Sequence, residues 1–416
     1  YPPMSTQLQA QGIELIEGFT KDQLSLNPDL FVIGNVVSRG NPLMEAILDA
    51  GLPFVSGPQW LGEQVLSKHH VLAVAGTHGK TTTSSLLAYL LSEIEVGCTA
   101  FLGGIASNFD SNLVLNAKSR YAVIEADEFD RSFLQLSPFA AIITAADPDH
   151  LDIYGSNDAF VEGFRQFTMR IDPKGFCIQK EGLALQSLAP VFTYGINSST
   201  AHYSFSNLRF ENGFQVADLR MGTQHFEGFE LGLPDIHNAE NALGCIPLLH
   251  CMGFEANSLR SALKSFKGVK RRFEYHLRTP DLVYIDDYAH HPTEINALIS
   301  SVRSMYPGWP ITGIFQPHLF SRTKDFAQDF ATSLSQLDAL YLLPIYPARE
   351  LPIPGVSSDW LAEITALPNK SVLQAHEVLT ALQKKQKGVI LTIGAGDIDR
   401  LVGPLTDLLK MQTNHS

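Results

Sequence analysis

An apolar strand pattern that runs directly into a glycine loop, a lysine and three threonines constrains this chain more than any other feature. The strand spans Val71 to Ala75, and it is followed by Gly76, Thr77, His78, Gly79, Lys80, Thr81, Thr82 and Thr83. In such a loop the backbone N–H groups point at phosphate oxygens, the lysine reaches the terminal phosphates, and the next hydroxyl can hold Mg²⁺. The pattern therefore predicts an ATP site with a loop shorter than the usual one, since Val74 stands at the position of the usual first glycine.

Composition excludes several classes of protein. A chain of 416 residues is long enough for about three domains. Its formal net charge of −13 argues against a nucleic-acid partner or an anionic membrane, and no apolar run approaches the roughly 20 residues that span a bilayer. The four cysteines lack the spacing of a zinc or redox motif, which indicates reduced thiols. We therefore expect a cytoplasmic protein that binds neither nucleic acid nor membrane.

The order of apolar runs and turn signals predicts an α/β fold in three units. Residues 1–68 alternate short strands with helices, but they start on a helix, so we expect an earlier strand and turn to be missing before Tyr1. Residues 69–278 carry the phosphate loop, and residues 279–416 alternate strands with helices as parallel sheets do. Between 176 and 229, short aromatic and β-branched runs with turns such as Glu211-Asn212-Gly213 predict an antiparallel patch.

Polar side chains follow the predicted strands of the central unit, where open α/β sheets bind their ligands. Four carboxylates lie within the six residues that follow the strand Ala122–Ile124. Glu125, the first of them, is the expected Mg²⁺ ligand, because hard cations prefer carboxylate oxygen; a solvated acidic loop is the alternative. After the strand Ala140–Ile143, His150 stands among acidic residues and could hold a second metal, although such a histidine is otherwise a hydrogen-bonded structural residue.

In the third unit, polar residues also follow the predicted strands. The strand Leu282–Ile285 is followed by Asp286 to Pro292, and the strand Ile311–Phe315 by Gln316 to Arg322. Arg322 could bind the carboxylate of a substrate, because a guanidinium matches that group with two parallel hydrogen bonds. A surface salt bridge is the alternative.

Taken together, these segments resemble the Mur ligase family of ATP-dependent, amide-forming enzymes of peptidoglycan synthesis. The resemblance covers essentially the whole chain and follows the order of the family's motifs. The segments are Gly76 to Thr83, Glu125-Ala126-Asp127-Glu128, Asp149-His150-Leu151-Asp152, His237 to Ala242, Arg271 to Glu274, Asp286 to Pro292 and Gly394 to Asp397. The resemblance implies a three-domain architecture with a partial Rossmann-like N-terminal domain for a UDP-sugar, a P-loop central domain for ATP, and a Rossmann-like C-terminal domain for the amino acid.

Two branches of the family are similar to different parts of the chain. From about Gly97 onward it looks like the branch that joins L-alanine to UDP-N-acetylmuramate, whereas the first ninety residues look more like the recycling branch that attaches a murein tripeptide. In this family the C-terminal domain holds the incoming amine, so L-alanine is the expected acceptor and the tripeptide the alternative. A nucleotide-binding regulatory protein that has lost turnover is a second alternative. We expect a monomer or homodimer.

The resemblance also assigns roles to single residues. Lys80 would hold the ATP phosphates, Thr81 and Glu125 one Mg²⁺, and His150 a second. His290 and Arg322 match positions near the incoming amino acid, and Leu319 stands where relatives often have another arginine. Asn238 would bind the adenine of the nucleotide, and Arg272 and Asp287 would contact its phosphate and ribose. Asn241 would also bind the nucleotide.

Overall fold

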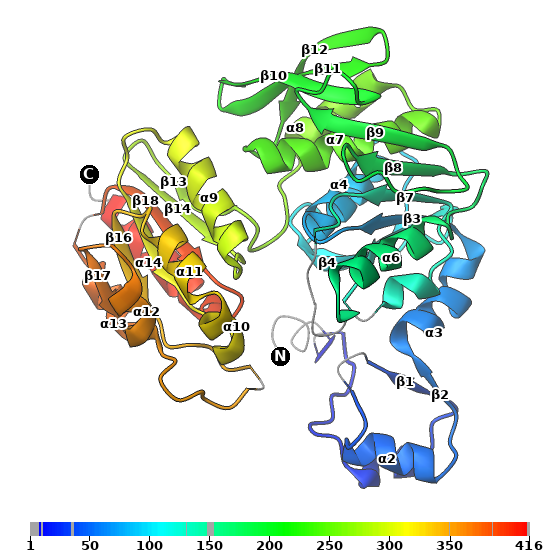
Figure 1. The fold of residues 1–416 in the computed structure, drawn as a ribbon, viewed down its shortest axis with the longest axis horizontal. Helices are drawn as coiled ribbons and strands as arrows, with labels where there is room; N and C mark the ends of the chain where they lie inside the picture. Colours follow the sequence, from blue (N-terminus) through cyan, green and yellow to red (C-terminus); the bar gives the residue numbers. More distant parts are fainter. Residues whose placement is uncertain are drawn as a thin grey trace.

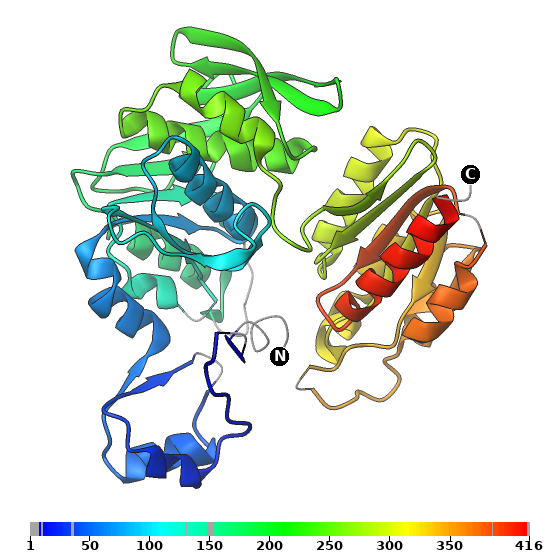
Figure 2. The same cartoon turned by 180° about the vertical axis from the view of Figure 1, so that it is seen from behind.

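The computed structural model describes residues 8–9, 11–34, 37–129, 131–147, 154–348, 350–384 and 386–413. Figures 1 and 2 show three bodies in chain order: a small N-terminal one, a large central one and a C-terminal one that a single segment after residue 265 connects to the centre. Each body is built around its own sheet.

The N-terminal body is a small βα unit. Its elements are η1 (Lys21–Leu26), β1 (Phe31–Ile33), α2 (Pro42–Asp49), β2 (Phe54–Ser56), α3 (Gly57–Gln64) and η2 (Leu66–Lys68). Strands β1 and β2 pair in parallel. Helix α2 begins at Pro42 because the Asn41 side chain accepts hydrogen bonds from the first turn and proline fits the first helical position.

The central body contains a ten-stranded sheet. Its strands are β3 (His70–Ala75), β4 (Thr99–Ala106), β5 (Ser111–Val114), β6 (Tyr121–Ala126), β7 (Ala140–Ile143), β8 (Phe176–Lys180), β9 (Val191–Ile196), β10 (Tyr203–Glu211), β11 (Phe214–Met221) and β12 (Gln224–Leu231). They lie in the order β12-β11-β10-β9-β8-β7-β3-β6-β4-β5. Pairing is parallel from β10 to β4 in that order and antiparallel at both ends.

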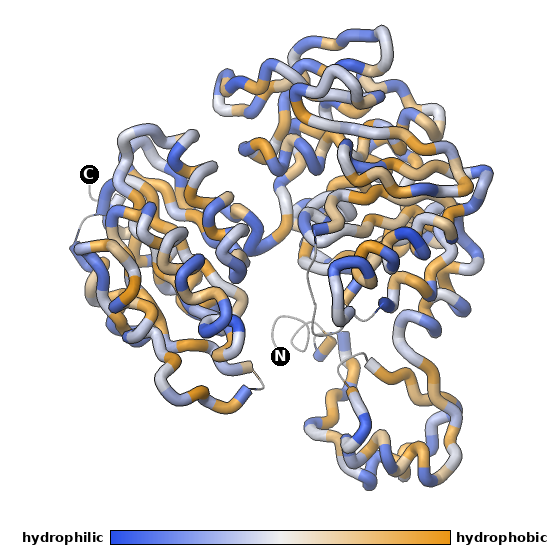
Figure 3. Tube along the Cα trace, viewed as in Figure 1, coloured by the Kyte–Doolittle hydropathy of each residue, from blue (hydrophilic) through white to orange (hydrophobic). Residues whose placement is uncertain are grey.

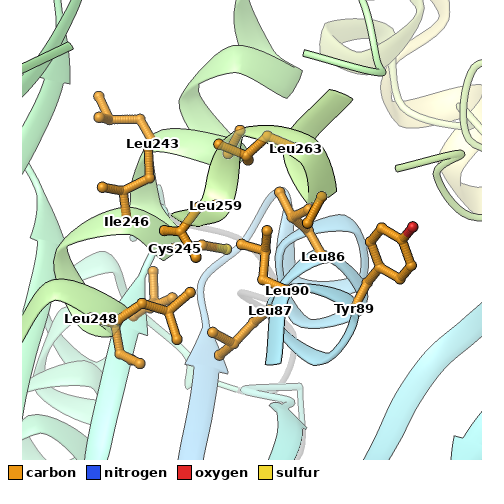
Figure 4. Close-up of a cluster of buried hydrophobic side chains, with 14 of the residues drawn as sticks. Leu86, Leu87, Tyr89, Leu90, Leu243, Cys245, Ile246, Leu248, Leu259 and Leu263 are labelled. Atoms are coloured by element: carbon orange, nitrogen blue, oxygen red, sulfur yellow. The ribbon is translucent and has the colours of Figure 1, made fainter. Parts of the chain in front are cut away.

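Helices cover both faces of the central sheet. They are η3 (Ser132–Gln135), α4 (Lys80–Glu93), α6 (Asn157–Thr168), α7 (Ile236–Cys251), η4 (Ala256–Leu259) and α8 (Arg260–Ser265). Alternate residues of β3 enter different clusters: Leu72 and Val74 pack with α4 and α7, whereas Val71 and Ala73 pack with α6. Figure 4 shows leucines of α4 meeting side chains of α7, η4 and α8. Because both faces are buried, β3 is apolar from Val71 to Ala75, and Figure 3 shows the same apolar character along the central strands.

The C-terminal body has a six-stranded sheet. Its strands are β13 (Glu274–Arg278), β14 (Leu282–Asp287), β15 (Ile311–Phe315), β16 (Ala339–Leu342), β17 (Lys370–Val372) and β18 (Gly388–Ile393). They lie in the order β13-β14-β18-β15-β16-β17, and only β13 is antiparallel to its neighbour.

Two groups of helices cover this sheet. The elements are α9 (Pro292–Met305), α10 (Phe320–Asp325), α11 (Ala327–Leu334), α12 (Ser358–Ile364), α13 (Ala375–Ala381) and α14 (Asp399–Thr413). Helices α9, α11 and α12 pack on one face and α13 and α14 on the other; α14 lies in front in Figure 2. Within the described residues, no helix combines the length and apolar character needed to cross a membrane.

Two features differ from the sequence analysis. The predicted antiparallel patch begins later, because β8 and β9 extend the parallel sheet and only β10, β11 and β12 form the meander. The Asn212-Gly213 turn does join β10 to β11, with both residues at positive φ. In addition, β13 pairs with β14, so the third sheet starts at Glu274, inside the range 69–278 given to the central unit.

We expect Phe167→Ala to lower the free energy of unfolding by about 3–5 kcal/mol, because it removes a fully buried ring and leaves a cavity. The Phe167 ring stacks on Phe133 with centroids 4.9 Å apart. Urea unfolding of the wild type, this variant and Phe210→Ala measures the effect. Phe210 is 49% exposed, so its truncation is expected to cost less than about 1 kcal/mol; equal losses for the two variants would contradict the packing.

Candidate active site

The phosphate loop lies at the carboxyl end of β3 and is fixed by close contact with the end of β7. Gly76 has φ +142°, and a Cβ there would lie 2.2 Å from Thr144 Oγ1. Gly79 has φ +79°, and a Cβ there would lie 2.3 Å from Asn241 Oδ1. Thr144 donates a hydrogen bond to the His78 carbonyl. At each of these two positions only glycine fits. The close approach that the glycines allow lets the loop lead directly into helix α4, which begins at Lys80.

A buried ion pair fixes the Lys80 side chain. Its Nζ lies 2.7 and 2.9 Å from the two carboxylate oxygens of Glu128 and 3.8 Å from Asp127 Oδ1. The Glu128 side chain is 1% exposed and that of Lys80 is 14% exposed. Burial raises the pKa of the Glu128 carboxyl, and the Lys80 charge opposes this shift.

Glu125 lies on the same side of the loop, and its surroundings fit a magnesium ligand. Its Oε2 accepts a hydrogen bond of 3.0 Å from the Gly103 N–H. Burial raises the pKa of this carboxyl, while Lys80 and the Thr81 hydroxyl act in the opposite direction. A carboxylate that is largely desolvated next to a threonine hydroxyl is a set of hard oxygen donors, which suits Mg²⁺. His150, the other predicted metal ligand, lies outside the described residues.

The predicted nucleotide residues of helix α7 lie beside the loop. The Asn238 amide donates to the Pro234 carbonyl (2.9 Å) and to Asp235 Oδ2 (2.8 Å), which leaves its own oxygen as an acceptor. Asn241 packs against Gly79. Thr82 is buried in helix α4, whereas Thr77 accepts a hydrogen bond from the Asp147 N–H.

Arg272 and Asp287 lie where the central and C-terminal bodies join. The Arg272 guanidinium lies over the Tyr288 ring, 5.1 Å from its centroid, and 4.0 Å from Glu294. Both Asp287 oxygens accept backbone N–H groups, from Phe273 at 2.7 Å and Ala289 at 2.8 Å. Burial raises the pKa of Asp287 to about 6, although the Arg272 charge lowers it.

Two histidines and an arginine form the third part of the site. The ring centroids of His290 and His318 are 6.2 Å apart, and His318 stacks on Tyr346. Burial lowers the pKa of His290, and it lowers that of His318 to about 4, with the Arg322 charge adding to both effects. Both imidazoles are therefore neutral at pH 7. Among the described residues, none forms an ion pair with the Arg322 guanidinium.

The structure thus brings the predicted residues together in two groups. Lys80, Thr81 and Glu125 surround the phosphate loop, and His290 and Arg322 lie at the carboxyl edge of the third sheet. Arg272 acts on both groups, since its charge lowers the pKa of Glu125 and of His290. In the described part of the chain, no hydrogen bond or ion pair joins Lys80 to Arg322 directly.

Sequence reasoning missed three residues of the site. Glu128 was one of four neighbouring carboxylates, and nothing in the pattern shows which one faces the lysine. His318 lies in a loop that sequence analysis examined, but only Arg322 was selected from it. Gly103 gives no signal except that it follows an apolar run.

We expect Gly103→Ala to weaken divalent-cation binding about tenfold. The new Cβ would lie 2.2 Å from Glu125 Oε2 and would displace that carboxylate. Binding of Mn²⁺ in the presence of ATP, followed by electron paramagnetic resonance, measures the effect. Gly403→Ala is the matched control, because no atom lies within 4 Å of a Cβ there; equal Mn²⁺ affinities in the two variants would refute the role of Gly103.

The pKa of His318 predicts a pH dependence of stability. Between pH 6.5 and about 4, this side chain binds a proton more readily in the unfolded than in the folded state, so the free energy of unfolding falls as the pH is lowered through that range. His318→Gln removes this contribution. Urea midpoints at pH 7 and pH 5 are therefore expected to differ less in the variant than in the wild type, and an identical difference in both proteins would contradict the shift.

Comparisons with known proteins identify the family of this chain. Residues 1–69 match the profile of the Mur ligase family catalytic domain, residues 74–249 that of the Mur ligase middle domain, and residues 271–396 that of the Mur ligase glutamate ligase domain. A UDP-N-acetylmuramate–L-alanine ligase from Porphyromonas gingivalis is 45% identical over 98% of this chain and 91% of its own length. That alignment includes nearly all of the first ninety residues, where sequence analysis found more similarity to the tripeptide branch.

Two solved structures share the fold over nearly the whole chain. The UDP-N-acetylmuramate–alanine ligase of Thermotoga maritima has a TM-score of 0.82 at 25% identity, covering 99% of this chain and 91% of that one. The murein peptide ligase of Psychrobacter arcticus has a TM-score of 0.71 at 25% identity, covering 98% and 92%. With its three matching domains and its relative at 45% identity, the chain belongs to the Mur ligase family.

Proposed function

We propose that this protein is an ATP-dependent ligase that joins L-alanine to the lactyl carboxylate of UDP-N-acetylmuramate in peptidoglycan precursor synthesis. The observation that carries the proposal is the Arg322 guanidinium, which has no ion-pair partner among the described residues and whose charge acts on two neutral imidazoles. A guanidinium in that state is a ready site for the carboxylate of an amino acid. The similarity to alanine ligases over most of the chain supports the same acceptor.

In this reaction the carboxylate of the sugar nucleotide takes the γ-phosphoryl group of ATP, which gives an acyl phosphate and ADP. The amine of L-alanine then attacks the acyl carbon, and phosphate leaves. Lys80 offsets the charge on the transferring phosphoryl group, so its position relative to the loop matters more than its mere presence. Thr81, Glu125 and His150 would hold Mg²⁺, which neutralises phosphate charge when bound. Asn238, Asn241, Arg272 and Asp287 are proposed to hold the rest of the nucleotide.

His290 is the proposed base for the amine. Its Nδ1 lies 3.0 Å from the Tyr288 carbonyl, which can only accept, so Nδ1 carries the proton and Nε2 has the lone pair that can accept one. Burial lowers the pKa of His290, which keeps it neutral at pH 7. A neutral imidazole near the ammonium group of the acceptor can take one of its protons. Both ATP and the UDP-sugar are cytoplasmic compounds, so we place the reaction in the cytoplasm.

A pocket of about 450 Å³ favours a second candidate, ligation of a murein tripeptide. It lies at the carboxyl ends of β15, β16 and β18, and Tyr346, which stacks on His318, forms part of its wall. This space exceeds what alanine needs and falls within the usual range for ligand pockets. A longer acceptor could therefore extend past Tyr346.

Substrate-dependent ADP release tests the proposal. With Mg-ATP and UDP-N-acetylmuramate, we expect L-alanine to drive ADP release and the tripeptide to drive little. We expect Lys80→Ala to abolish it. Release with the tripeptide alone would overturn the acceptor assignment, and ATP binding without release by either acceptor would indicate a regulatory homologue.

We expect Arg322→Gln to raise the KM for L-alanine about 10- to 100-fold, because it removes a charge-assisted bidentate contact. The KM for ATP is expected to stay within threefold of the wild-type value. Arg303→Gln is the control: Arg303 lies in the last turn of helix α9 and pairs with Asp338, and this variant is expected to leave both constants unchanged. Similar KM values for L-alanine in the two variants would exclude Arg322 from the acceptor site.

A further inference from the structure

The Lys80–Glu128 pair is built more rigidly than a salt bridge at the surface. Two oxygens of one carboxylate lie within 3 Å of Lys80 Nζ, and water is almost excluded from the Glu128 side chain. The Glu128 backbone is held as well: its carbonyl accepts a hydrogen bond of 2.6 Å from Tyr154 Oη and one of 3.0 Å from the Arg131 N–H. The Tyr154 ring in turn contacts Phe160 in the core beneath α6.

Stability does not account for this arrangement. Taking two charges out of water costs several kcal/mol each, and a buried pair often stabilises a fold no better than apolar residues of similar volume. A hydrophobic pair at these positions would serve the core equally well. The pair is better explained by what Lys80 needs at the end of the phosphate loop.

A free lysine side chain has many rotamers, and fixing it costs about 1.5–2 kcal/mol of conformational entropy. If the carboxylate fixes the side chain before ATP arrives, this cost does not fall on the binding or the chemical step. An ammonium group has three protons, so one that binds Glu128 can still donate to a phosphate oxygen.

We propose that Glu128 is a positioning residue that holds the Lys80 ammonium in its working place at the phosphate loop, both before ATP binds and during phosphoryl transfer. This inference rests on the proposed function, since it takes Lys80 as the phosphate ligand. Asp127 does not share the role: it lies 3.8 Å from Nζ, beyond hydrogen-bond distance, and its side chain is 49% exposed.

Glu128→Gln and Asp127→Asn form a matched pair for the test, since each removes one charge from the same loop. We expect kcat for ligation to fall about 10- to 100-fold in Glu128→Gln and less than twofold in Asp127→Asn. The Kd for Mg-ATP and the KM for L-alanine are expected to stay within threefold of the wild-type values in both variants, and Tm is not expected to fall.

A lower Tm with an unchanged kcat would mean a structural role and would overturn the proposal. Tighter Mg-ATP binding with an unchanged kcat would overturn it too, since Glu128 would then compete with ATP for the lysine.

A second measurement reports on the pair without any turnover. Acylation of lysines by acetic anhydride, followed residue by residue with mass spectrometry, measures how accessible Lys80 Nζ is in the free protein. We expect Lys80 to react about tenfold faster in Glu128→Gln, less than twofold faster in Asp127→Asn, and other lysines to be unchanged. An unchanged Lys80 rate would refute the pairing. If the wild type formed no amide product, the proposed function would fail while this measurement still decided the role of Glu128.

Discussion

The whole phosphate site depends on how closely the loop after β3 approaches the end of β7. A single methyl group at Gly76 would overlap Thr144 Oγ1, and the backbone of Ala145 lies nearly as close. This contact makes the loop turn at once into helix α4, which begins at Lys80. Because β3 lies between β7 and β6 in the sheet, the same turn brings Lys80 next to the loop that follows β6. Two strand ends and one glycine therefore determine where the lysine and the carboxylates meet.

Burial then determines how these charges behave. Glu125 and Glu128 follow the same strand, and burial raises the pKa of both, but their contacts differ. Glu128 is paired with Lys80, whereas Glu125 accepts a hydrogen bond from the Gly103 N–H and interacts with the Thr81 hydroxyl. The first carboxylate is paired with a cation of the protein itself, and the second is the one we propose as a metal ligand. The same loop can in this way hold both the paired Glu128 and the proposed metal ligand Glu125.

The sequence predicted those parts of the site that depend on local chain geometry. A glycine loop between a buried strand and a helix has one folded form, so Lys80 and Thr81 could be assigned from the pattern alone. The choice among neighbouring carboxylates could not be made in this way, because the side chain that faces Lys80 depends on the path of the loop and on Tyr154. The strands β8 and β9 were expected to be antiparallel because their apolar runs are short and follow one another closely along the chain, yet they pair in parallel with each other, and β9 also pairs in parallel with β10.

The segment between the central and C-terminal bodies shows how the two halves of the site are coupled. Arg271 and Phe273 both have positive φ, at 63° and 50°, which costs about 1 kcal/mol or more for each such residue. Hydrogen bonds hold Arg271 in this conformation, from its N–H to Glu274, from its guanidinium to the Gly394 carbonyl, and from the Tyr288 N–H to its own carbonyl. Arg272, in the link between the two bodies, therefore contacts Tyr288 and Glu294 of the C-terminal body while its charge lowers the pKa of Glu125 at the phosphate loop.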